Sequence, residues 1–68
     1  MEKNKLQSLW KKRSKTSPFK VLITSGDRKI TLDLNRFDVS FGSNDLHLYT
    51  KGFIALVDSV PYNRIAMG

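Results

Sequence analysis

Cysteine is absent from this 68-residue chain, and histidine occurs once. The first absence excludes disulfide bonds, and together the two leave the chain without the ligands of a structural zinc site. Long apolar runs are also missing: the longest, residues 53–57, is far shorter than the ~20 residues that cross a bilayer. No apolar run follows the charged N-terminus, so we expect no secretory signal, no membrane association and a cytoplasmic location. Nothing in the sequence implies a cofactor or a metal.

The shortness of the chain limits how it can be stabilised. With 68 residues it forms one domain, which buries a smaller fraction of its surface than a larger domain does. Because disulfides and zinc are excluded, association of several copies is the remaining stabilising device. We therefore expect a homo-oligomer.

The charge of +6 is confined to one end of the sequence. Residues 1–20 contain seven lysines and arginines against a single acidic residue, Glu2, whereas residues 21–68 contain five basic and five acidic residues. Such an asymmetry indicates a polyanionic partner, and nucleic acid is the first candidate. The alternative is a solvated basic segment that keeps a small protein soluble.

The basic end has the period of a helix. Leu6, Leu9 and Trp10 follow the i, i+3, i+4 spacing and share one face, and Asn4 is placed to cap the start. Pro18 disfavours helical geometry in the residue before it. The sequence thus predicts a basic amphipathic helix and linker over residues 1–18, with the helix face packed on the rest of the protein.

From residue 19 onward the apolar residues alternate with a period of two, which is typical of half-buried strands. Turn signals at residues 25–27, 42–45 and 51–52 separate short strands, Asn35 and Arg36 interrupt the pattern, and residues 53–57 are continuously apolar. This spacing predicts a mostly β (α+β) fold, in which the N-terminal helix precedes a small five-stranded antiparallel barrel over residues 19–60. Residues 61–68 are expected to form an irregular tail in which Tyr62 and Ile65 can still pack.

Several short motifs resemble the Sm-like family, in particular its bacterial Hfq branch. A helix and five short strands follow the order of that fold, and the similar residues are 6–13 (LQSLWKKR), Gly26, Phe37-Asp38 and 48–54 (LYTKGFI). This sequence departs from the family at three positions: Ser25 replaces an asparagine, Thr50 separates Tyr49 from Lys51, and Gly52 replaces a histidine. The resemblance implies an Sm-like or SH3-like barrel, ring assembly, RNA binding and a basic patch on the outer rim.

No arrangement of residues indicates catalysis. His47 and Asp45 would share one face of a strand, but no strained nucleophile turn or oxyanion site accompanies them, so we interpret His47 as a surface residue. The four glycines are too widely spaced for a phosphate-binding loop. We therefore predict no catalytic residues, no metal ligands and no enzymatic activity.

Cations and an exposed ring make the best candidate binding residues. Lysine and arginine attract phosphates without regard to sequence, and aromatic rings stack on unpaired bases. Tyr49 alternates out of phase with the apolar residues around it, which fits either base stacking or a barrel tyrosine with its hydroxyl at the rim. The predicted RNA-binding residues are Lys11, Lys12, Arg13, Lys15, Tyr49 and Lys51.

The sequence therefore predicts a non-enzymatic RNA-binding module. Another possibility is a small protein-interaction module that docks on an acidic partner and regulates a nucleic-acid-processing machine such as a polymerase or a nuclease. A third is a subunit with no ligand of its own. In an Sm-like ring, Leu46, Leu48 and residues 53–57 are expected at or near the contact between subunits.

Overall fold

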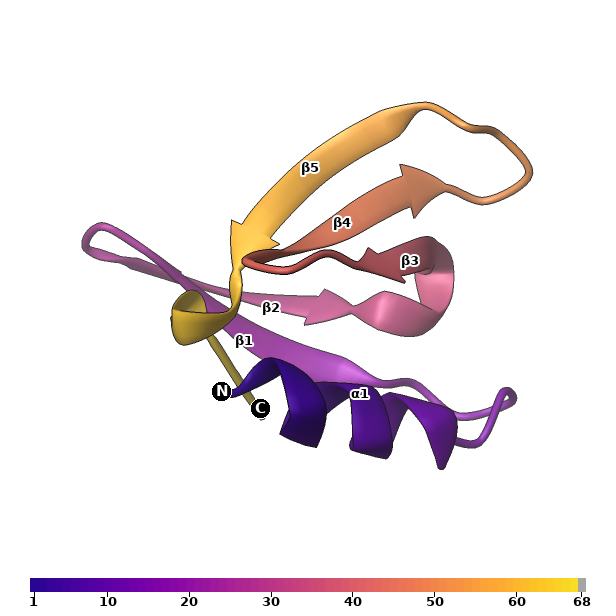
Figure 1. Ribbon diagram of the computed structural model, residues 1–68, viewed down its shortest axis with the longest axis horizontal. Helices are drawn as coiled ribbons and strands as arrows, with labels where there is room; N and C mark the ends of the chain where they lie inside the picture. Colours follow the sequence, from indigo (N-terminus) through magenta and orange to yellow (C-terminus); the bar gives the residue numbers. More distant parts are fainter. Residues whose placement is uncertain (68) are drawn as a thin grey trace.

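Two small antiparallel sheets and one helix make up the computed structural model, which describes residues 1–67 (Figure 1). The elements are α1 (Lys3–Lys11), β1 (Lys20–Ser25), β2 (Arg28–Asp33), η1 (Leu34–Arg36), β3 (Phe37–Phe41), β4 (Asp45–Thr50), β5 (Leu56–Pro61), η2 (Tyr62–Arg64) and β6 (Ile65–Met67), where η denotes a 3-10 turn. The predicted mostly β fold with an N-terminal helix is confirmed. Residues 1–67 form six strands, one more than expected.

The strand order is β2-β1-β6 in one sheet and β3-β4-β5 in the other. The 3-10 turn η1 leads the chain from β2 to β3, and η2 leads it from β5 back to β6. Asp33 fixes the first of these crossings, since its Oδ1 accepts hydrogen bonds from the backbone N–H groups of Phe19 (2.9 Å) and Asn35 (3.0 Å). The sequence break at Asn35 and Arg36 is therefore the point at which the chain changes sheets.

The helix begins slightly earlier than predicted. Glu2, not Asn4, is the N-cap residue, and no side chain caps the first turn. The face predicted from the periodicity is correct: Leu6 is fully buried, and Leu9 and Trp10 are partly buried against the core. Burial of an aliphatic side chain contributes about 1.5–3 kcal/mol, so Leu6 is the principal anchor of α1.

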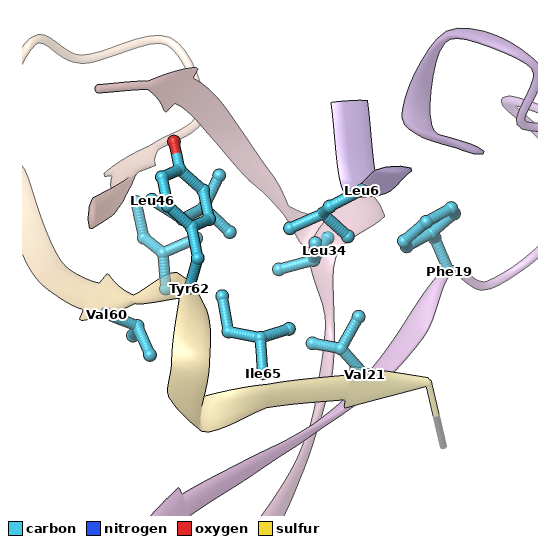
Figure 2. Packing of buried hydrophobic residues seen from close by; sticks show 9 residues of the cluster. Leu6, Phe19, Val21, Leu34, Leu46, Val60, Tyr62 and Ile65 are labelled. Atoms are coloured by element: carbon cyan, nitrogen blue, oxygen red, sulfur yellow. The ribbon is translucent and has the colours of Figure 1, made fainter. Parts of the chain in front are cut away.

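The core lies between the two sheets and the helix. Figure 2 shows side chains from α1, η1 and both sheets turned toward a common centre, with Leu6 and Leu34 near its middle. The buried residues are Leu6, Phe19, Val21, Leu34, Leu46, Leu48, Val60, Tyr62 and Ile65. Phe37, Val39 and Phe41, which alternate along β3, are partly buried against this core.

The last long strand lies later in the sequence than the apolar run predicted. Gly52 has a positive φ of 80°, and the N–H of Phe53 bonds the carbonyl of Thr50 at 3.0 Å, so a turn occupies the start of the run. The five-strand prediction implied a strand within residues 53–57, but β5 begins only at Leu56 and extends to Pro61, so it shares just the last two of these residues. Left-handed glycine geometry at the turn, rather than apolar composition, decides where this strand starts.

The C-terminal segment is ordered into regular elements. Residues 61–68 were expected to be irregular, but Pro61 ends β5, η2 follows, and β6 pairs with β1 through Ile23↔Ile65 and Val21↔Met67. Residue 68 lies outside the described residues. Tyr62 and Ile65 are buried, as anticipated. Their carbonyls also accept hydrogen bonds from the amino group of Met1 (2.8 and 2.7 Å), which ties the two ends of the described chain together.

Candidate nucleic-acid interface

Arg13, one of the predicted phosphate-binding cations, is used by the fold. Its guanidinium carbon lies 3.6 Å from the centroid of the Trp10 ring. Its Nη1 donates to the carbonyl of Trp10 (2.8 Å), and its Nε donates to Oδ1 of Asn35 (3.0 Å). The Trp10 ring also contacts the ring of Phe19 in a T-shaped arrangement, with 5.2 Å between the centroids. Arg13 thus fastens the end of α1, and its donors are already occupied in part.

Asn35 joins the linker after α1 to the crossing between the sheets. Its Nδ2 donates to the carbonyls of Ser14 (3.2 Å) and Ser17. These two bonds, with the one from Arg13, hold residues 13–17 against η1. The linker therefore has a fixed position on the surface, and Lys15 within it lies close to η1.

Three exposed lysines lie on α1 and this linker: Lys11, Lys12 and Lys15. Two further exposed cations come from distant parts of the chain. Phe37 pairs with Thr50 at the end of the β3–β4 ladder, so Arg36 and Lys51, which adjoin this pair in the sequence, lie at the same end of the ladder. We call these five cations the basic end (Lys11, Lys12, Lys15, Arg36 and Lys51). In Figure 1 the segments that carry it lie along the right-hand side.

Tyr49 lies beside the basic end on the outer surface of the β3-β4-β5 sheet. Its neighbours across the strands are Asp38 and Leu56, and the side chain is half-buried. It alternates with the buried Leu48 and therefore lies on the opposite, outer face of the sheet. Asp38 also stabilises the adjacent turn, because its Oδ2 accepts from the N–H of Gly52 at 3.4 Å.

The remaining large hollow has a different character. A shallow depression of about 630 Å³ lies between the start of α1, the β3–β4 turn and η2. Its lining includes the carboxylates Glu2 and Asp45, which oppose the approach of a phosphate. Burial first, and Asp45 second, raise the pKa of the Tyr62 phenol above its ordinary value. Lys3 also lines this hollow, so its charged side chains are of mixed sign, whereas the five side chains of the basic end are all cationic.

His47 is a packing residue in this arrangement. A β-carbon added at Gly42 would come within 3.2 Å of the His47 ring, so the ring lies against the β3–β4 turn. Within residues 1–67, no three histidine, aspartate or glutamate side chains converge as metal ligands would. The only helix in that range is also too short and too polar to cross a membrane.

No protein-family model, curated protein or solved structure matches this chain. The resemblance to the Sm-like family consequently stays a prediction.

The structure adds Arg36 to the residues proposed from sequence. Its position after an interrupted strand indicated a turn, but no sequence pattern related it to the lysines of α1. Only the hydrogen bonds of Asn35 and the β3–β4 register bring Arg36 to the same end as Lys15 and Lys51.

Proposed function

We propose that this protein is a non-enzymatic RNA-binding module that holds the phosphate backbone at its basic end. The observation that carries the proposal is the convergence of cations from α1, the linker, η1 and the β4–β5 turn. Charges from four separate segments at one end form a continuous attractive field for a polyanion.

The choice of single-stranded RNA rests on Tyr49. Base stacking on a surface ring requires an unpaired base, and a ring beside phosphate-binding cations is the usual arrangement of such sites. Tyr49 and Lys51 lie on either side of Thr50, the last residue of β4. Lys51 can therefore contact a phosphate while Tyr49 stacks on the base of the same nucleotide. Arg13 supports the site indirectly by fixing the linker that carries Lys15.

The fold we propose for this function is a small barrel of the Sm-like or SH3-like kind. In that arrangement β2 and β3 form one bent strand interrupted by η1, and β5 and β6 form another interrupted by η2. Strand pairing within each sheet, the two 3-10 crossings and the shared core support this interpretation.

The proposal is tested by removing cations at two different ends of the molecule. Lys11, Lys12 and Lys15 are changed together to alanine, and affinity for several unrelated unstructured RNAs is measured over a range of salt. Each lost phosphate contact lowers the slope of log K against log salt by roughly 0.7 on a single strand, so three contacts lower it by about 2. Affinity should fall by a similar factor for every RNA.

The matched control is the triple alanine variant of Arg28, Lys29 and Arg64, three exposed cations at the start of β2 and at the end of η2. It removes the same charge from elsewhere, so it should keep most of the salt slope. If both triple variants lose the same RNA affinity and the same salt slope, binding depends on net charge alone, and the proposal of a site at the basic end is overturned. Absence of RNA binding by the parent chain would remove the proposal, and an acidic protein partner would then be the function to test.

A further inference from the structure

The apolar surface left uncovered by the fold gathers on one edge. In the β4–β5 hairpin, Ile54 is 97% exposed, Phe53 69%, Leu56 56% and Val57 55%. Residues 51–59 are all exposed, so neither face of the first half of β5 is covered. Figure 1 shows this part of the hairpin projecting on the side away from α1. Phe53 and Ile54 form what we call the apolar tip.

A groove lies at the other end of the same strand. It has a volume of about 250 Å³ and separates the β1–β2 hairpin from the second half of β5. Its apolar lining comes from both sheets and includes Ile30, Leu48 and Val60. Ile30 is 49% exposed there, so the groove leaves part of its lining in contact with water.

Between the tip and the groove, β5 is an edge strand. It pairs with β4 on one side only, and Val57 is the extra residue at a register shift, because Leu48 pairs with Asp58 while Tyr49 pairs with Leu56. Exposed apolar edge strands are usually covered or paired, since their free backbone groups recruit another strand. The tip lies three to four residues before Val57, and Val60 and Pro61 of the groove lie equally far after it.

We propose that two copies of this chain associate through β5, antiparallel about a two-fold axis at Val57. In this arrangement the apolar tip of each copy meets the groove of the other, because tip and groove are equidistant from the axis. One contact surface then pairs with itself, as a closed dimer requires. The proposal is independent of RNA binding.

Charge also favours the antiparallel direction. Residues 52–57 carry no charge and are flanked by Lys51 on one side and Asp58 on the other. An antiparallel pair centred on Val57 places Asp58 opposite Leu56 of the partner and Lys51 opposite Asn63, so no like charges lie directly opposite one another. A parallel pair would instead bring both lysines together and both aspartates together, which is unfavourable across adjacent strands.

The first test measures molar mass by light scattering at tens of micromolar. The full chain should give twice its 7.8 kDa, and Val57→Lys or Ile54→Lys should raise the dimer dissociation constant at least tenfold. Both side chains are more than half exposed, so the substitutions spare the core. Ser40→Lys, exposed on β3 at the opposite edge of the same sheet, is the matched control and should stay dimeric. A monomeric parent, or a dimer that survives Val57→Lys, overturns the proposal.

The second test exploits the absence of native cysteine. Under mild oxidation, Val57→Cys should form a disulfide-linked dimer in high yield, because the same position from both copies meets at the axis. Ser40→Cys should not. A larger assembly in which Val57→Cys fails to cross-link would be a head-to-tail ring and would also overturn the two-fold arrangement.

Discussion

The central guanidinium carbon of Arg13 lies 3.6 Å from the centroid of the Trp10 ring, while its Nε donates a hydrogen bond to Oδ1 of Asn35. One side chain therefore connects the end of α1 to the crossing between the two sheets. This relationship separates Arg13 from the neighbouring lysines, which are exposed. Its contribution is to position the basic end as well as to add charge.

Replacement of Arg13 is expected to destabilise the fold. Arg13→Lys keeps the charge but loses the planar fork that stacks on Trp10 and bonds Asn35, at a cost of about 1–2 kcal/mol. Urea denaturation measures the change. Lys12→Ala, at an exposed neighbouring position, should change the free energy of unfolding by less than ~0.5 kcal/mol. Equal stabilities of the Arg13→Lys and parent proteins would show that the contacts of Arg13 with Trp10 and Asn35 do not stabilise the fold.

Tyr49 is expected to affect RNA affinity through its ring. Tyr49→Ala should weaken binding of unstructured RNA by about 1–3 kcal/mol, with little change in the salt slope, because stacking involves no phosphate. Tyr49→Phe keeps the ring and should bind as the parent does. If the alanine variant loses stability but not affinity, Tyr49 is a packing residue at the rim.

Gly42 is expected to resist substitution although its turn is accessible. A β-carbon at this position would lie 2.9 Å from the backbone carbonyl of Asp45 and 3.2 Å from the His47 ring. Gly42→Ala should therefore destabilise the protein by about 1–3 kcal/mol in thermal or urea unfolding. Adding His47→Ala should restore only part of the loss, because the backbone clash persists. Full restoration would assign the whole effect to the His47 ring.

Tyr62 is expected to produce a loss of stability at alkaline pH. Burial first and the Asp45 carboxylate second raise the pKa of Tyr62 above its ordinary value of 10.0. The folded state therefore favours the protonated phenol, and this stabilisation is complete below pH 10 and declines as pH rises through the folded-state pKa. The difference in unfolding free energy between the parent and Tyr62→Phe, followed from pH 7 to 11, isolates this effect from other titrating groups.

The same substitution has a second effect at neutral pH. The Tyr62 hydroxyl donates to the carbonyl of Gly42 at 2.7 Å, so Tyr62→Phe should cost about 0.5–1.5 kcal/mol there. The difference in unfolding free energy between the parent and the Tyr62→Phe protein should then become smaller above pH 10. A difference that stays constant over the whole pH range would contradict the raised pKa.

Local periodicity determined much of the fold from the sequence alone. The helical spacing of Leu6, Leu9 and Trp10 identified the buried face of α1, and the alternation from residue 19 onward identified β1 to β4 and the turn at residues 42–45. These features were predictable because side-chain direction within one element depends only on its own period. The confinement of net positive charge to residues 1–20 was equally visible in the sequence.

Contacts between distant segments decided the rest. The three-residue strand β6 forms by pairing with β1, which lies far from it in the sequence. The start of β5 depends on the positive φ of Gly52 more than on apolar composition. From the sequence, Arg13 was predicted to bind phosphate, but in the structure it contacts Trp10 and Asn35. The position of Arg36 at the basic end follows from the β3–β4 register and not from any local sequence pattern. Sequence spacing fixes which face of an element is apolar, whereas the pairing of elements far apart in the chain is set by packing, which only the tertiary structure reveals.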